Sequence, residues 1–450
     1  MYIITLRCRT SVYFDCINKL PNLIERGIEI GLAGLAVTDH ETLAQSIRVC
    51  KLQKKYPDFK IAIGNEIYLT DTRDKGQKYY HYILIAKDAE GHKQLRRLSS
   101  RAWLCSYYDR GMERVPTLKS ELEFIVKQNP GHLIATSACI GSELGYSILE
   151  LSTAKAIGDG KAETAAYNRI VKYLSFNKIL FGDDFYLEIA PAASKEQIIV
   201  NNMISKLSAL YSIPIVIGDD SHYLKKEDRY IHKAYLNSKG GERETDIFYE
   251  YSYLQDENDI RENLKKSDID VDSCFKNSMN LYEKIEIYDL LHSQTIPSVP
   301  VKDYPKEEEE NLPEVEKQWP ELYRMFHSDD IYERYWVNEC IYNLEHKYLS
   351  KPVYWDELEE EARVKRIIGE KLNTNMFKYP ITLKYYIDMM WDNGSLVGAG
   401  RGSSCAALNH YLLGITQLDP IEWKLPFFRY MNDERVELGD IDIDICPSKK

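Results

Sequence analysis

The sequence predicts an α/β protein in which a repeated strand-and-helix pattern is followed by a second, more mixed domain. Short apolar runs that end in polar side chains recur along the first part of the chain, and segments with helical spacing separate them. Three of these runs are GLAGLAVTDH, FKIAIGNE and IPIVIGDDSH. Strands that alternate with helices are typical of a parallel sheet or barrel, and active groups in barrels collect at the carboxyl ends of the strands.

A proline-rich, acidic stretch separates the two parts of the chain. It contains an acidic run at 307–310, and its prolines are Pro297, Pro300, Pro305 and Pro313. This composition is typical of an exposed linker. Beyond it, residues 327–349 and 355–372 have helical spacing, with oppositely charged pairs on faces that we expect to be exposed. We therefore predict a first domain at 1–288, a linker at 289–325 and a second domain at 326–450.

The composition indicates a globular protein of the cytoplasm. With 450 residues, 44% hydrophobic and 28% charged, the chain can build two or more domains with their own cores. A net charge of -12 argues against a broad DNA-binding surface in this portion. We expect no membrane contact, because no apolar stretch approaches the roughly 18 residues of a membrane span and no secretory signal is present. Nine cysteines without a Cys-x-x-Cys pair favour a reducing compartment.

The run GDIDIDI at 439–445 predicts a metal-binding strand. Asp440, Asp442 and Asp444 alternate with isoleucines, so a strand would place the three carboxylates on one face. Three neighbouring anions repel each other unless cations lie between them. Anionic clusters of oxygen ligands suit Mg²⁺, which can activate an attacking oxygen and stabilise a leaving one in phosphoryl transfer. The alternative is a solvated acidic edge strand.

The run GAGRGSS at 398–404 predicts a phosphate-binding loop. Its glycines permit a tight backbone, and Ser403 or Ser404 could cap a helix at 405–413. Amides at such a helix start, together with Arg401, would face an anion. Many Gly-x-Gly-x-Gly loops are only turns. Here the acidic run that follows within about one supersecondary unit makes the phosphate interpretation more specific.

These C-terminal segments resemble the palm of the C-family bacterial replicative DNA polymerases, the polymerase III alpha subunits. The resemblance rests on GRGS at 400–403, LLGITQLDP at 412–420, FFRYMNDERV at 427–436 and DIDID at 440–444, in the family's order and spacing. It implies a partial nucleotidyltransferase palm (α+β) like that of polymerase beta, with Asp440 and Asp442 as catalytic Mg²⁺ ligands and Asp444 as an accompanying acid. The residues that it implies for triphosphate binding are Gly400, Arg401, Gly402, Ser403, Ser404 and Arg435.

The same resemblance implies the partners of a replicative polymerase. These would be primer-template DNA, deoxynucleoside triphosphates, the remaining C-terminal polymerase region, a sliding clamp and a proofreading exonuclease. The family palm also uses a third catalytic aspartate on a later strand. Because the sequence stops at Lys450, we expect this portion to be inactive by itself.

Residues 1–288 resemble the PHP domain (polymerase and histidinol phosphatase) that begins the same polymerases. The resemblance rests on VTDH, NEIYL, HYILIAK, GHKQLRRLSSRA, SACIGSEL, FYLEI and DDSHYLKKEDRYIH. It implies a distorted (β/α)7 barrel with a trinuclear metal site, used for phosphoester hydrolysis and in some polymerases for proofreading. The ligands that it implies here are Asp15, His40, Glu66, His81, Cys139, Asp220 and His222.

The departure from the PHP pattern lies at the first strand. Where the family has His-x-His, this chain has Arg7-Cys8-Arg9, and arginine has no lone pair to give to a metal. We hypothesise that Arg7 and Arg9 pair with leftover acids such as Glu66 and Asp220. Such a degenerate site argues against bound Zn²⁺ or Mn²⁺.

Three functions therefore stay open. The first is a polymerase that transfers deoxynucleotides to a primer 3'-hydroxyl. The second is a non-catalytic structural or interaction module, in which the barrel braces the palm or an exonuclease. The third is a metal-dependent PHP phosphoesterase.

Overall fold

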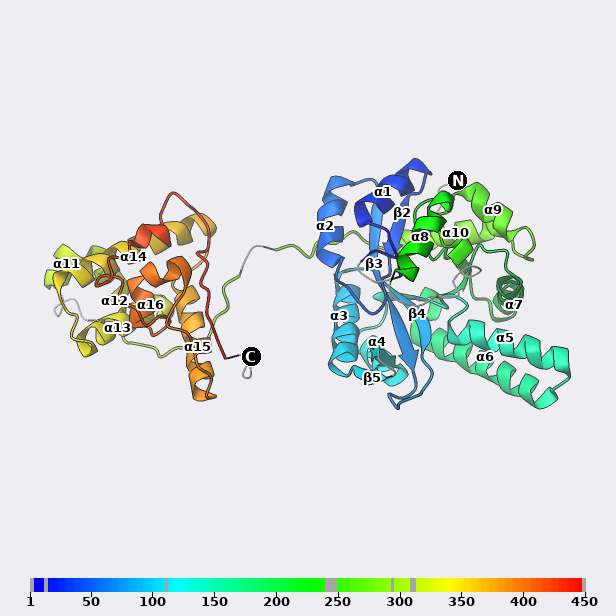
Figure 1. Ribbon diagram of the computed structural model, residues 1–450, viewed down its shortest axis with the longest axis horizontal. Helices are drawn as coiled ribbons and strands as arrows, with labels where there is room; N and C mark the ends of the chain where they lie inside the picture. The colour runs from blue at the N-terminus through cyan, green and yellow to red at the C-terminus, as the bar shows by residue number, and fades with distance from the viewer. Residues whose placement is uncertain are drawn as a thin grey trace. The chain divides into compact units, whose positions relative to one another are not determined.

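The computed structural model describes residues 4–11, 15–109, 112–238, 249–292, 295–307 and 313–446. The chain forms two compact units, Met1–His292 and Ser293–Lys450 (Figure 1). Most of the predicted acidic run, 308–310, lies outside the described residues. The predicted linker at 289–325 includes two helices, α11 (Pro313–Gln318) and most of α12 (Pro320–Phe326).

The first unit is built around a nearly closed, barrel-like sheet, as expected. In sheet order its strands are β1 (Ile4–Cys8), β2 (Gly34–Val37), β3 (Lys60–Thr70), β4 (Tyr80–Ala86), β8 (Leu133–Thr136), β9 (Phe185–Ile189) and β10 (Ile215–Ile217). The segment after β10 returns to β1, where Ser221 N donates to Arg7 O at 2.9 Å and Arg9 N donates to Ser221 O at 3.1 Å. These two bonds bridge the seam between the first and last strands.

The sheet is mixed, and our expectation of a parallel sheet is wrong for β4. Strands β1 to β3 are parallel to one another, and so are β8 to β10, but β4 runs antiparallel to both β3 and β8. The physical reason is the short connection 71–79 between β3 and β4. A parallel return needs a crossover of a dozen or more residues, usually with a helix.

Short strands and ten helices among the described residues complete the first unit. Strand β7 (Pro116–Leu118) pairs with β3, and β5 (Tyr107–Asp109) with β6 (Met112–Arg114) forms a separate two-stranded antiparallel sheet. The helices are α1 (Leu20–Glu29), α2 (Ser46–Lys55), α3 (Ala89–Leu104), α4 (Lys119–Gln128), α5 (Glu143–Ile157), α6 (Gly160–Phe181), α7 (Lys195–Tyr211), α8 (Arg229–Asn237), α9 (Glu257–Leu264) and α10 (Val271–Glu283). In Figure 1, α2 and α3 flank β2 to β4 on one side, and α5 and α6 form a pair on the other.

Both faces of the central strands are buried. In β4, Tyr82 and Leu84 belong to one hydrophobic cluster, whereas Ile83 and Ile85 belong to another. Successive side chains of a strand point to opposite faces, so β4 packs against apolar groups on both sides. This explains why the strands read as continuous apolar runs in the sequence.

The described part of the second unit is mainly helical. Its long helices are α13 (Ile331–His346), α14 (Pro352–Leu372) and α15 (Lys378–Asp392), and a short helix, α16 (Leu408–Leu412), follows them. They pack around the fully buried Trp336. Among the described residues, the sheet expected for an α+β palm is represented by one antiparallel bridge, between Val397 and Ile445.

One charged pair on α14 departs from the predicted exposed faces. Glu361 and Lys365 have the i,i+4 spacing of a surface pair, but both are buried. Glu361 accepts hydrogen bonds from Leu408 N at 2.5 Å and Asn409 N at 3.0 Å, the first amides of α16. Because those amides have no intrahelical acceptor, a buried carboxylate there is stabilised by them and by the helix dipole.

Candidate functional site

A cluster of acids and histidines lies where the barrel strands converge. The structure brings together the seven side chains expected at the degenerate PHP site: Asp15, His40, Glu66, His81, Cys139, Asp220 and His222. Most follow the carboxyl ends of parallel strands, as barrels favour. His81 instead begins β4. Because β4 is antiparallel, its start lies beside the carboxyl end of β3, where Tyr68 pairs with His81.

Arg7 and Arg9 lie in the middle of this cluster and contact two of its acids. The two side chains are separated by one residue at the end of β1, and both are fully buried. Arg7 Nη2 lies 2.6 Å from Glu66 Oε2 and 3.0 Å from Asp220 Oδ2. Arg9 donates from Nη2 to the same Glu66 Oε2, and its Nε lies 3.2 Å from Asp220 Oδ1. Arg9 Nη1 also donates to the carbonyl oxygen of Thr38 at 3.0 Å.

The two guanidinium groups keep both acids ionised. Burial alone would raise the pKa of Glu66, but Arg7 and then Arg9 hold that pKa well below its usual range. The same two arginines lower the pKa of the buried Asp220 against the effect of burial. The cluster therefore consists of buried cations and anions that neutralise each other directly.

The three histidines of the cluster differ in charge. Burial would lower the pKa of His81, but Glu66, whose Oε1 lies 2.7 Å from His81 Nδ1, raises that pKa to about 10. Burial and then Arg9 lower the pKa of His40 to about 4, although Asp15 Oδ2 lies 3.4 Å from its Nε2. Asp220 and Asp15 raise the pKa of His222 against the effect of burial. At neutral pH, His40 is therefore neutral and His81 is charged.

The donor set does not fit the trinuclear metal site of a PHP domain. His40, Glu66 and His81 do offer ligand atoms within 4.8 Å of one another. However, Glu66 Oε2 already contacts both guanidinium groups, and each oxygen of Asp220 contacts one of them. A metal ion would have to displace these contacts and lie beside two fixed positive charges.

Two further acids, Glu188 and Asp219, belong to the cluster but were not predicted from the sequence. Glu188 in β9 has its Oε1 3.5 Å from Arg7 Nη1 and accepts a hydrogen bond from Thr136 Oγ1. Asp219 accepts from Thr5 Oγ1. Burial raises the pKa of each carboxyl to about 7. The signal that could have identified Glu188 is a charged residue inside the apolar strand sequence FYLEI.

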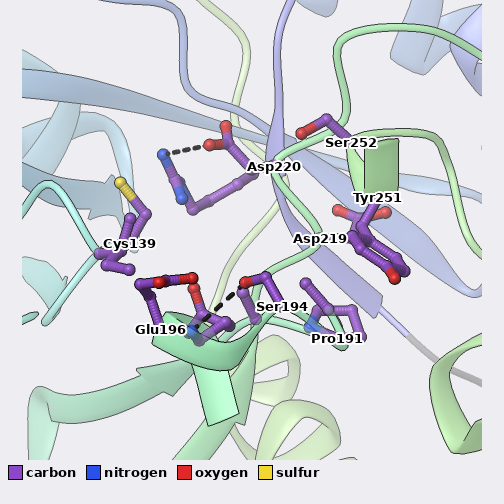
Figure 2. A pocket seen from close by; sticks show the side chains of 13 residues that line it. Cys139, Pro191, Ser194, Glu196, Asp219, Asp220, Tyr251 and Ser252 are labelled. Carbon is purple, nitrogen blue, oxygen red and sulfur yellow. Dashed lines mark hydrogen bonds and ion pairs between the residues drawn. The ribbon is translucent and has the colours of Figure 1, made fainter. Parts of the chain in front are cut away.

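A cavity of about 540 Å³ opens beside this cluster. Its lining includes Arg7, the loop after β9 and the start of α7. Figure 2 shows Asp220 on one side of the pocket, with Ser194 and Glu196 across from it and Cys139 beside them. A small solute could therefore reach the buried arginine cluster from outside.

The second candidate site joins the glycine-rich loop to the acidic run. Gly398 N donates to Asp444 O at 2.8 Å, and Cys446 N donates to Leu396 O at 3.1 Å. Arg401 Nε lies 3.7 Å from Asp442 Oδ2, and Arg401 Nη1 lies 3.6 Å from Asp444 Oδ1. The two motifs, about 40 residues apart in sequence, therefore lie side by side, as a palm-like site requires.

The acidic run has the predicted alternation but is not an assigned strand. Asp440, Asp442 and Asp444 are exposed, whereas Ile441 and Ile443 are half-buried against the hydrophobic clusters of the unit. Only the end of the run is bridged to another segment. Two backbone hydrogen bonds are too few to build a ladder, so the predicted strand is present as an extended segment.

The helix that follows the glycine-rich loop begins later in the chain than predicted. A 3₁₀ turn spans Gly402–Ala406, and α16 begins at Leu408 instead of residue 405. Neither serine caps α16, since Glu361 takes its first amides. Ser404 is buried and its Oγ donates to Arg401 O at 2.8 Å, whereas Ser403 is exposed. The predicted anion site at the helix start is therefore wrong, and the exposed loop 400–403 is what remains.

Arg435 is not in contact with this loop in the described part of the chain. Its side chain is exposed and pairs with Glu437. Its expected role in triphosphate binding stays a prediction.

The loop depends on Gly400. Its φ is 132°, and an added β-carbon would lie 2.7 Å from Cys405 Sγ and 3.2 Å from Thr416 side-chain atoms. We predict that Gly400→Ala lowers the free energy of unfolding by about 2–4 kcal/mol, because it combines backbone strain with a steric clash. Gly394→Ala is the matched control, since Gly394 also has a positive φ (72°) but has no atom within 4 Å of the added carbon. Urea unfolding of both variants checks this; equal losses would contradict the clash.

Comparisons with known proteins match both units. The PHP domain family matches residues 5–192, and the bacterial DNA polymerase III alpha NTPase domain matches residues 330–450. The probable DNA polymerase YorL of Bacillus subtilis and a DNA-directed DNA polymerase of Bacillus phage SPbeta are each 36% identical, over 97% of this chain and 35% of their own length. The DNA polymerase III subunit alpha of Borreliella burgdorferi is 30% identical, over 95% of this chain and 34% of its own.

The chain thus spans about a third of the length of these curated relatives. Among solved structures, a proposed metal-dependent phosphoesterase from Bifidobacterium adolescentis aligns with 60% of this chain and 98% of its own, at 14% identity and a TM-score of 0.30. A TM-score this low supports no conclusion about function. Within the described residues, no helix is both long and apolar enough to span a membrane.

Proposed function

This chain belongs to the family of the bacterial DNA polymerase III alpha subunits, and on that premise we propose that its second unit forms part of the nucleotidyl-transfer site of a replicative DNA polymerase. The whole protein would extend a primer by attack of its 3'-hydroxyl on the alpha-phosphate of a deoxynucleoside triphosphate. The observation that carries this proposal is the contact between the glycine-rich loop and the acidic run.

The acidic run has the chemistry that Mg²⁺ requires. Its three carboxylates are exposed and separated by half-buried isoleucines, and the donor set contains only oxygen. Asp440 and Asp442 would hold the ion, with Asp444 beside them. When bound, Mg²⁺ supplies charge neutralisation for the attacking and leaving oxygens in phosphoryl transfer.

Arg401 would position the triphosphate. Its side chain is 60% exposed, and its contacts with Asp442 and Asp444 are long, at 3.7 and 3.6 Å. Exposed pairs of this kind are weak, so Arg401 can exchange these acids for phosphate oxygens. An added β-carbon at Gly402 would lie 3.8 Å from Asp442 Oδ2, which places the loop backbone next to the acid. Gly400, Ser403 and Ser404 shape the rest of this loop.

The partners of the whole protein follow from the same proposal. They are primer-template DNA, deoxynucleoside triphosphates and the region that completes the polymerase, with a sliding clamp and a proofreading exonuclease as further candidates. We propose that the protein acts in the cytoplasm. The free cysteines of the described residues agree with a reducing compartment.

Primer extension tests the polymerase proposal. The chain is assayed with Mg²⁺, alone and together with a polypeptide that supplies the remaining region of the Bacillus relative. We expect extension from the combined sample. Absence of extension from a well-folded combined sample would contradict the proposal.

The first unit supports a second function, that of a structural module that does not depend on metal. Its acids are neutralised by Arg7 and Arg9 where a PHP phosphoesterase would hold metal ions. Guanidinium groups cannot activate water as a metal ion does. This favours a brace for the palm or for an exonuclease over the alternative of an active phosphoesterase.

A double substitution distinguishes these alternatives. We predict that Arg7→His with Arg9→His creates a metal site, because it supplies two imidazole ligands and removes two positive charges. Addition of Zn²⁺ or Mn²⁺ should then raise the melting temperature of the double variant but not that of the unaltered chain. Arg26→His with Arg48→His, on α1 and α2 away from the cluster, is the matched control. A metal-dependent rise in the unaltered chain would contradict the prediction.

A further inference from the structure

A groove with basic and apolar walls lies between α3 and α4 of the first unit, and it shares no lining residue with the cavity beside the arginine cluster. The two helices pack against each other, and the groove between them has a volume of about 780 Å³. Figure 1 shows α3 and α4 next to each other in the first unit. We call this feature the basic groove and define it by Lys93, Arg96, Arg97, Arg101 and Leu104 of α3 and Phe124 of α4.

The cations of the basic groove form one stripe on α3. Positions 93, 97, 101 and 104 are three or four residues apart, and position 96 is three residues after 93, so all five lie on one side of the helix. Lys93 and Arg101 have acidic partners, Glu90 and Glu121. Arg96 and Arg97 are exposed and form no ion pair with any carboxylate among the described residues. The groove thus has a local positive charge in a chain whose net charge is -12.

The acid inside the groove does not cancel this charge. Glu121 contacts Arg73 through both carboxylate oxygens, at 3.0 and 2.6 Å, as well as Arg101 at 3.0 Å. Arg73 lies outside the groove, and its two contacts neutralise the charge of Glu121. Arg96 and Arg97 are left available for an anionic partner.

The other wall and one end of the groove are apolar and exposed. Phe124 is 60% exposed and Leu104 is 83% exposed. Large apolar side chains gathered at one hollow on the surface are typical of a binding site. A DNA backbone would use the arginines but would gain little from Phe124 and Leu104, so the combination favours a protein partner.

We propose that the basic groove binds an amphipathic helix of a protein partner, with acidic residues against Arg96 and Arg97 and apolar residues against Phe124 and Leu104. The stripe from Lys93 to Leu104 covers about 16 Å along α3, or about three helical turns. This length suits an apolar face with residues at i, i+3, i+4 and i+7, as in other complexes of a helix in a groove. Charge complementarity selects an acidic helix.

Fluorescence anisotropy with a defined probe tests this proposal. The probe is a labelled synthetic helix of about 18 residues, with leucines on one face and glutamates on the flanks. It is titrated with the 450-residue chain at about 0.1 M salt. We expect Arg96→Glu with Arg97→Glu to weaken binding by about tenfold or more, and Phe124→Ser by about fivefold.

Matched controls lie on other helices of the same unit. Arg48→Glu with Lys51→Glu makes the same charge change on exposed positions of α2, and Ile179→Ser removes a side chain of α6 that is 79% exposed. Both should bind the probe as the unaltered chain does. Single-stranded and duplex DNA of similar length serve as competing ligands.

Three results would overturn the proposal. The first is no binding of the probe, and the second is binding that both groove variants leave unchanged. The third is tighter binding of DNA than of the helix, if that DNA binding is lost in the double arginine variant and unchanged by Phe124→Ser. That last pattern would make the basic groove a nucleic-acid surface.

Discussion

Asp442→Asn should reduce primer extension by the completed polymerase by about a thousandfold, the largest effect that we expect of any single substitution. Loss of one metal-binding carboxylate removes several kcal/mol of charge stabilisation in the transition state. The substitution preserves the shape of the side chain, which is 57% exposed, so folding should be unaffected. The rate of extension of a labelled primer, together with circular dichroism of the variant, measures this.

Asp392→Asn is the matched control for that experiment. Asp392 is an exposed carboxylate at the end of α15 in the same unit, outside the loop and the acidic run. We expect its rate to stay within about twofold of the unaltered protein. Extension that survives Asp442→Asn, or that falls equally in both variants, would show that the acidic run does not carry the chemistry.

Arg9→Met should lower the free energy of unfolding of the first unit by about 3–5 kcal/mol. The substitution retains a long apolar side chain but leaves Glu66 and Asp220 with one guanidinium in place of two. An uncompensated charge in a buried site is the main cause of the loss. Urea unfolding followed by tryptophan fluorescence and circular dichroism measures it.

Two further variants keep this prediction testable if Arg9→Met folds poorly. Combining Glu66→Gln with Arg9→Met should restore part of the lost free energy of unfolding, since it removes the anion that Arg9 neutralises. Arg169→Met breaks an exposed pair with Glu150, and should change stability by no more than about 0.5 kcal/mol. If Arg9→Met costs as little as Arg169→Met, the arginine cluster does not hold the barrel together.

Much of the barrel could be predicted because its strands are short, apolar and followed by polar residues. The sequence segments that end at His40, Glu66 and His222 each contain a strand of the sheet. The direction of β4 could not be read from the same pattern, since periodicity does not give strand orientation. The length of the connection 71–79 was the available signal, because it is too short for a parallel crossover.

The pairing of Arg7 and Arg9 with acids could be anticipated from chemistry. Two arginines at positions where metal ligands were expected must find anions when buried, and the nearest anions were the leftover acids. Glu188 and Asp219 were harder to foresee. Their contacts with Arg7 and Thr5 depend on how three separate strands meet, and one sequence does not contain that information.

In the second candidate site, the acidic run could be predicted from the sequence, but a buried acid of the same unit could not. The alternation of Asp440, Asp442 and Asp444 with isoleucines was readable from the two-residue period of an extended chain. The buried Glu361, which takes the amides at the start of α16, looked like one of many surface glutamates on α14. A local pattern could not distinguish it, because its burial arises from packing against α16, about 47 residues later in the chain.

Metal analysis of the purified 450-residue chain tests most directly whether arginines have replaced metal ions in the first unit. After dialysis against metal-free buffer, inductively coupled plasma mass spectrometry should find almost no tightly bound Zn²⁺ or Mn²⁺, because the oxygens of Glu66 and Asp220 are already paired with Arg7 and Arg9. Two or more tightly bound ions per chain, lost on substitution of Glu66 by glutamine, would contradict this.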